Sequence, residues 1–102
     1  MKVIWTKYAL ESLSKIYKYY EQIAKVKVAS NIRNQLFYST KQLEKFPLSG
    51  PVEEFFIELD EEHRFITRGN YKIIYKIMNS KIYITDIFDT RQNPEELKFR
   101  NK

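Results

Sequence analysis

The sequence predicts one α+β domain, in which a strand and two helices precede a three-stranded antiparallel meander. Apolar residues recur every three or four positions through the first half of the chain, whereas apolar runs in the second half follow a period of two. Two-residue turn signals separate those later runs. The chain has 102 residues, of which 43% are hydrophobic, and residues 1–102 therefore suffice for one domain with its own core.

The first elements are a short strand and a long helix. Val3 to Trp5 is an apolar run that suits a strand. Thr6 can then cap a helix, because its hydroxyl can accept a hydrogen bond from an unpaired backbone N–H. The helix is predicted by apolar residues at spacings of three and four, namely Ala9, Leu10, Leu13, Ile16, Tyr17, Tyr20, Ile23 and Ala24.

A second helix follows after a short link near Lys25 to Lys27, so the two helices are expected to form an antiparallel hairpin. Proline disfavours helical backbone in the residue before it, which predicts that this helix stops at Pro47. Its apolar positions are Ala29, Ile32, Leu36, Leu43 and Phe46, with Thr40 filling the gap.

The meander is predicted after a loop at Leu48 to Pro51 and an acidic stretch, Val52 to Glu62, that has no clear period. Two-residue turns with Gly or Asn are the usual hairpin connections. The strands are expected over His63 to Arg68, Tyr71 to Met78 and Lys81 to Phe88, with Gly69-Asn70 and Asn79-Ser80 as the turns.

Alternation assigns the faces of the middle strand. Tyr71, Ile73, Tyr75 and Ile77 form the predicted core face. On the last strand, Asp86 interrupts the apolar rhythm, which indicates a bulge or a deliberately polar position.

A short helix is expected to follow the last strand. Asn93 can cap it, Pro94 suits its first position and Glu96 can complete a capping box. Arg91 would then lie at the corner between strand and helix.

Charge and composition limit the function classes. The net charge is +5, and residues 1–51 contain nine Lys/Arg against three Asp/Glu, whereas residues 52–102 contain nine against ten. Such asymmetry suits a polyanion such as RNA or an acidic protein partner, or is simply a solvated lysine-rich helix face. The chain has no cysteine and no apolar window of membrane-spanning length, so a soluble, cytoplasmic protein is expected, with no membrane partner.

Conventional catalytic signatures are missing. The sequence contains neither a Gly-rich phosphate loop nor a Gly-x-Ser-x-Gly elbow, and its single histidine cannot build a multi-histidine metal site. No cofactor and no metal are therefore predicted. The remaining candidates are five cations on or near the meander, namely Arg64, Arg68, Lys72, Lys76 and Arg91.

Arg64 with Arg68, and Lys72 with Lys76, alternate within their own strands, so each pair is expected on one face. If the register places both pairs on the same face, the sheet offers a cationic surface for phosphate, and RNA cleavage without a metal could follow. The alternative is that these cations face water and keep strand edges from pairing. His63 is interpreted as a bystander.

Arg91 has two acidic neighbours in sequence, Asp86 and Asp89. A structural Arg–Asp pair that locks the corner and a functional guanidinium remain alternatives. Several tyrosines of the first helix could stack on bases, although the helical spacing favours a place in or beside the core for Tyr8, Tyr17 and Tyr20.

These motifs resemble the RelE/ParE family, the toxins of bacterial type II toxin-antitoxin pairs, over nearly the whole chain. The most specific segments are Gly69 to Tyr75 and Ile84 to Pro94. The resemblance implies a helical hairpin packed on an antiparallel sheet, and a cognate antitoxin whose C-terminal segment wraps the toxin.

The family has two activities, ribosome-dependent cleavage of mRNA in RelE-like members and inhibition of DNA gyrase in ParE-like members. The resemblance implies catalytic roles for Lys72 and Arg91. The cationic surface described above assigns contacts to RNA phosphates to Arg64, Arg68 and Lys76. RelE-like nucleases also carry a C-terminal Tyr or His, where this chain has Leu97 and Phe99. Both targets therefore stay open, as does the alternative of a non-toxic RNA- or protein-binding module that has kept the fold.

Overall fold

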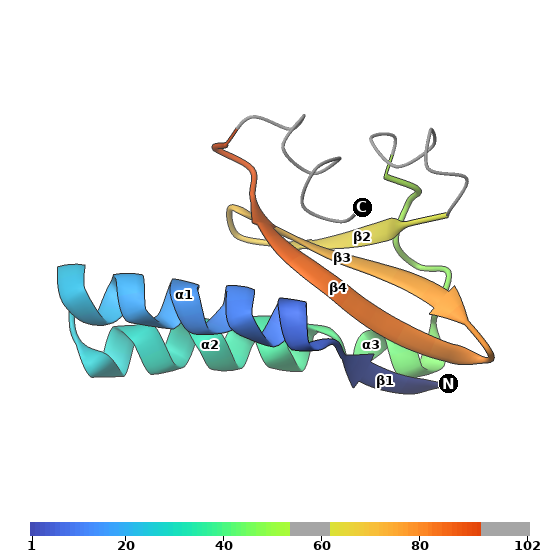
Figure 1. The fold of residues 1–102 in the computed structure, drawn as a ribbon, viewed down its shortest axis with the longest axis horizontal. Helices are drawn as coiled ribbons and strands as arrows, with labels where there is room; N and C mark the ends of the chain where they lie inside the picture. Colours follow the sequence, from blue (N-terminus) through green and yellow to red (C-terminus); the bar gives the residue numbers. More distant parts are fainter. Residues whose placement is uncertain (54–61, 93–102) are drawn as a thin grey trace.

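A computed structural model describes residues 1–53 and 62–92 of the chain. A helical hairpin lies against one face of a four-stranded sheet, which confirms the predicted α+β class (Figure 1). The expected C-terminal helix with its cap at Asn93 lies outside the described residues. The elements are β1 (Lys2–Trp5), α1 (Lys7–Ile23), α2 (Val26–Ser39), α3 (Gln42–Lys45), β2 (Arg64–Arg68), β3 (Tyr71–Met78) and β4 (Lys81–Asp89).

The sheet has the strand order β1-β4-β3-β2. The meander β2-β3-β4 is antiparallel as expected, but β1 joins β4 in parallel, with Val3 opposite Ile82. Asn79 and Ser80 both have positive φ, at 54° and 59°, as a tight hairpin turn requires. The last strand bulges opposite Ile74 and Tyr75, which confirms the irregularity predicted at Asp86.

α1 begins where the sequence predicts. The Thr6 hydroxyl accepts a hydrogen bond from the Ala9 backbone N–H at 3.2 Å and donates one to the Ile84 carbonyl at 2.8 Å. The cap therefore fixes both the helix start and its attachment to β4. The buried stripe is narrower than the apolar pattern, because Leu10 and Ile23 are exposed.

The single second helix expected up to Phe46 is wrong, because the structure has two helices, α2 and α3, with a break at Thr40. The Thr40 backbone N–H and hydroxyl both donate to the Phe37 carbonyl, at 3.3 and 2.8 Å. A bond to the residue three positions earlier tightens the turn and ends the regular helix. After this break, α3 buries Leu43 in the core.

The core lies between the hairpin and the sheet. Tyr71, Ile73 and Tyr75 of β3 are buried there as predicted, and Ile77 packs at its margin. Ile74, on the opposite face of β3, is also fully buried, which alternation alone did not predict. The core cluster consists of Ala9, Leu13, Leu36, Leu43, Ile66, Tyr71, Ile73, Tyr75, Ile82, Ile84 and Ile87.

Candidate functional site

The register separates the two pairs of cations on the meander. Arg64 lies opposite Tyr75 and Arg68 opposite Tyr71, so both arginines share the face of the core tyrosines. Lys72 is opposite Thr67 on the other face, and Lys76 follows it there. The common cationic surface that depended on register therefore does not form.

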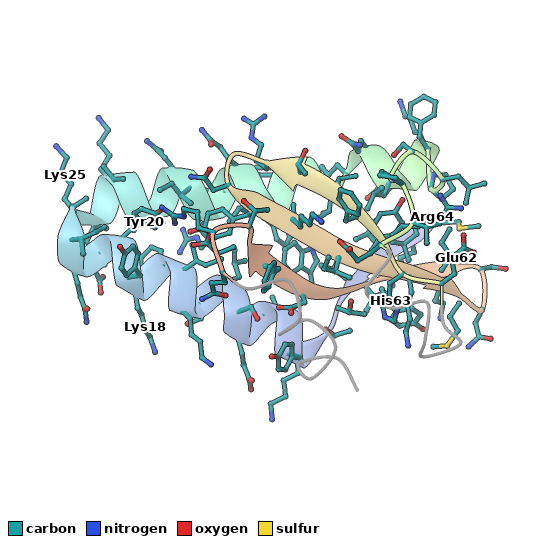
Figure 2. All side chains as sticks on the ribbon, turned by 90° about the horizontal axis from the view of Figure 1, so that it is seen from above. Lys18, Tyr20, Lys25, Glu62, His63 and Arg64 are labelled. Atoms are coloured by element: carbon teal, nitrogen blue, oxygen red, sulfur yellow. The ribbon has the colours of Figure 1, made fainter. Side chains whose placement is uncertain are left out.

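Arg64 binds the loop that contains Gly50, at one end of the molecule. Its Nη1 donates to the Gly50 carbonyl at 2.8 Å, and its Nη2 lies 2.7 Å from a carboxylate oxygen of Glu62. Figure 2 shows Arg64, Glu62 and His63 at the end opposite to Lys25, which marks the tip of the hairpin. Both terminal nitrogens of the guanidinium bind groups of the preceding segment, so the visible role of Arg64 is to tie β2 to that segment.

Lys72 is paired with a buried acid. Its Nζ donates to the Glu53 carboxylate at 2.8 Å and lies 4.3 Å from the centre of the Phe65 ring. Glu53 is only 2% exposed. Because a charge taken out of water requires a partner, this lysine neutralises Glu53 and anchors its segment beside β2.

Two further residues, Lys76 and His63, lie in a small hollow and in the protein interior, respectively. Lys76 lines a small hollow of about 180 Å³ together with Glu62 and Arg64. His63 is 1% exposed, and its carbonyl accepts a hydrogen bond from the Glu53 N–H at 2.7 Å. The imidazole is thus not presented to a substrate at the surface.

Arg91 forms the Arg–Asp pair that the sequence left open, and the partner is Asp89. The Nε and Nη2 of Arg91 donate to the two carboxylate oxygens of Asp89 at 2.9 and 2.7 Å, and its backbone N–H adds a third bond at 2.9 Å. These bonds lower the pKa of Asp89, against a smaller opposing effect of burial. Asp86 is used elsewhere, accepting hydrogen bonds from the Ser12 hydroxyl and the Ile87 N–H.

The Arg91–Asp89 pair lies on a groove between α1 and the end of β4. The groove has a volume of about 620 Å³. Its lining consists of Tyr8, Ser12, Lys15, Ile16, Tyr19, Tyr71, Ile87, Asp89, Arg91 and Gln92. Near the tip of the helical hairpin, the Tyr71 hydroxyl donates to that of Tyr20 at 3.3 Å, and burial raises the pKa of Tyr71.

The helical pattern assigned too much of α1 to the core. Tyr8 and Tyr19 are 40% and 52% exposed and line the groove. The signal that could have identified this wall is the spacing of Tyr8, Ser12, Lys15 and Tyr19, which follow one another at four, three and four positions. That row is a second face of α1, beside the buried one.

The two predicted catalytic cations do not converge. Arg91 lines the groove together with Tyr71, whereas Lys72 is the next residue on β3 and extends from the opposite face. Neither the described residues 1–53 nor 62–92 contain a group of three acidic, histidine or cysteine side chains that could hold a metal ion. None of the described helices is long and apolar enough to cross a membrane.

Replacing Arg91 by glutamine should raise the pKa of Asp89, because its two side-chain donors are lost while the backbone bond remains. A lowered carboxyl pKa stabilises the fold above the unfolded-state value of about 3.9, and that stabilisation is lost as the pH falls through the folded-state value. The variant should therefore lose less stability than the wild type between pH 6 and pH 2, and the difference should be small because the pair is exposed to solvent.

NMR titration of the Asp89 carboxyl carbon measures this shift directly. Lys81→Gln is the matched control, since it removes an exposed cation at the other end of β4. Equal Asp89 pKa values in the wild type and the Arg91 variant would contradict the assigned pair.

We compared the fold and the sequence of this chain with those of known proteins. A solved structure described as a chromosomal ParDE toxin-antitoxin system from P. aeruginosa superposes with a TM-score of 0.74, over 87% of this chain and 95% of that chain. At 21% identity, this likeness establishes the fold. No curated protein matches the sequence. The family model for the ParE toxin of the type II toxin-antitoxin system parDE matches residues 3–94, and the chain therefore belongs to the ParE toxin family.

Proposed function

We propose that this chain is a toxin that arrests growth by binding DNA gyrase, and that a cognate antitoxin neutralises it. The observation that carries the choice of gyrase over mRNA is the separation of Lys72 and Arg91 onto different faces. Membership in the ParE family supports the toxin role, and the gyrase target is the one expected of ParE-like members.

Cleavage of RNA would require cations around one phosphate, together with groups that remove and deliver a proton. Here, Lys72 and Arg91 are each held by a carboxylate, from Glu53 and Asp89, that a phosphate would have to displace. Tyr71 is a poor base, because its raised pKa keeps the phenol protonated at neutral pH. This arrangement favours binding over catalysis.

The groove beside Arg91 supports a protein partner. Tyrosine and arginine are enriched at the centres of protein interfaces. Tyr8, Tyr19 and Tyr71 line this groove together with two isoleucines, and Lys15 and Arg91 supply cations. We assign the groove to the cognate antitoxin. In a toxin-antitoxin pair, the toxin would bind its antitoxin before it meets its target.

Induced expression without the antitoxin, scored by viable counts, tests the toxin role. Gyrase supercoiling and mRNA cleavage in a reconstituted translation system then separate the targets. We expect inhibited supercoiling and intact mRNA. Ribosome-dependent cleavage that is abolished by Arg91→Ala but not by the control Lys81→Ala would contradict the gyrase proposal.

The second candidate is a non-toxic RNA- or protein-binding module. The carboxylates that pair with Arg64, Lys72 and Arg91 favour it as well, because a neutralised cation stabilises a phosphoryl group poorly. Normal growth at good soluble expression would select this candidate and exclude a toxin.

A further inference from the structure

The outer face of α2 carries one continuous polar stripe. Ala29 and Leu36 mark the buried side of this helix. On the opposite side, four residues follow at spacings of four, three and four, which is the period of one helix face, and a fifth lies three positions further on, just past the end of α2 at Ser39. These residues, here called the α2 stripe, are Lys27, Asn31, Asn34, Tyr38 and Lys41, and all are exposed.

The α2 stripe lies in a segment without acids. From Gln22 to Leu43 the chain has four cations and no Asp or Glu, whereas α1 alternates its lysines with Glu11 and Glu21. A solvated helix face usually mixes both signs of charge, as α1 does. The one-sided charge of α2 instead suits an anionic partner.

Arg68 adds a cation from β2. It lies beside α2 in a hollow of about 440 Å³. The other lining residues are all neutral and polar, namely Asn31, Asn34, Gln35, Tyr38 and Ser39. Amide and hydroxyl groups of this kind donate hydrogen bonds to phosphate oxygens, while Lys and Arg supply charge.

Tyr38 lies near the middle of this surface and is 58% exposed. The Lys41 ammonium lies 4.8 Å from the centre of its ring, and Phe37 packs edge to face against it. From Lys27 to Tyr38 the α2 stripe covers 11 positions of the helix, which corresponds to roughly 16 Å and spans several phosphates of one strand, and Lys41 follows just beyond the break at Thr40.

We propose that the α2 stripe and Arg68 bind the phosphate backbone of duplex DNA. A protein partner is disfavoured because the stripe has no aliphatic side chain that could form an apolar interface centre. A convex helix surface with amides between cations fits a duplex, whose phosphates lie along its outer rim. This activity goes beyond the proposed function, because inhibition of gyrase does not require that the toxin itself contact DNA.

Fluorescence anisotropy of the isolated chain with a labelled 20-base-pair DNA duplex tests the proposal. Three cations predict that the logarithm of the binding constant falls with the logarithm of salt concentration with a slope of roughly −3. Arg68→Ala should reduce that slope by about one, with little dependence on base sequence. Tighter binding to an RNA duplex of the same sequence, or no binding to DNA at low salt, would overturn the proposal.

Two matched double variants distinguish DNA binding by the α2 stripe from a general effect of net charge. Lys27→Glu with Lys41→Glu should weaken DNA binding by about ten-fold or more at low salt. Lys18→Glu with Lys81→Glu changes the net charge equally on α1 and β4, and should weaken it far less. Figure 2 marks Lys18 on α1. Equal weakening by both variants, each folded by circular dichroism, would refute the site.

The supercoiling assay distinguishes this proposal from the proposed function. If the α2 stripe variant loses DNA binding but still inhibits gyrase, both proposals stand. If the wild type binds DNA but leaves gyrase active, only the gyrase proposal fails.

Discussion

Lys72→Ala should lower the free energy of unfolding by about 3 kcal/mol, far more than removal of a typical surface lysine. The reason is Glu53, whose carboxylate is 2% exposed and receives the Lys72 ammonium at 2.8 Å. Without that partner, a negative charge stays buried beside β2. Urea denaturation at pH 7 measures the loss.

Two controls define the origin of this effect. Lys81→Ala removes an exposed lysine from the same hairpin and should change stability by less than about 0.5 kcal/mol. Lys72→Met combined with Glu53→Leu removes both charges and should recover most of the loss, since apolar replacements of a buried ion pair are often tolerated. A single Lys72→Ala variant as stable as the wild type would show that the ion pair contributes nothing.

This prediction bears on functional assays of Lys72. Loss of toxicity in Lys72→Ala would be expected from unfolding alone, whatever the target. The double variant separates the two causes, because it removes the lysine while keeping the chain folded. A toxic double variant would exclude a catalytic role for this side chain.

Gly50→Ala should also cost about 3 kcal/mol or more, because the site leaves no room for a side chain. A Cβ atom there would lie 2.3 Å from the Phe65 carbonyl oxygen and 2.9 Å from Cε1 of Tyr75. The residue cannot move freely, since its N–H donates to the Tyr75 hydroxyl at 3.0 Å and its carbonyl accepts from Arg64. Thermal or urea unfolding reports the change.

Gly69→Ala is the matched comparison. Gly69 has a φ of +58°, but nothing lies within 4 Å of its added Cβ. Only the cost of the left-handed backbone remains, about 1 kcal/mol. The steric explanation for Gly50 would be wrong if the two alanine variants were equally stable.

Local features of the fold were predictable because they depend on neighbouring residues. Thr6 caps α1 and Asn79-Ser80 forms a tight turn, as expected from side-chain chemistry and backbone preference. The bulge next to Asp86 was visible as a break in alternation. The break at Thr40 was not, because a threonine within an apolar pattern does not reveal whether its hydroxyl will bind the preceding turn.

Features that depend on strand register could not be predicted. Alternation placed Arg64 with Arg68 and Lys72 with Lys76, but only the pairing of β2 with β3 determines whether these two pairs share a face. The Lys72–Glu53 pair likewise joins residues from two segments whose spacing in sequence says nothing about contact. The groove at Arg91 forms only when α1 is docked on β4, so the helical pattern, which placed Tyr8 in or beside the core, could not predict it.

The parallel pairing of β1 with β4 also determines which parts of the protein can fold first during synthesis. β1 precedes its partners, Lys81 to Ile84, by 79 positions, so these leave the ribosome much later than β1 does. Such distant contacts slow folding because a long loop must close before they form. The helical hairpin can form early, but the groove at Arg91 and the ion pairs of the meander cannot, so the nascent chain would acquire the groove only after β4 has been translated.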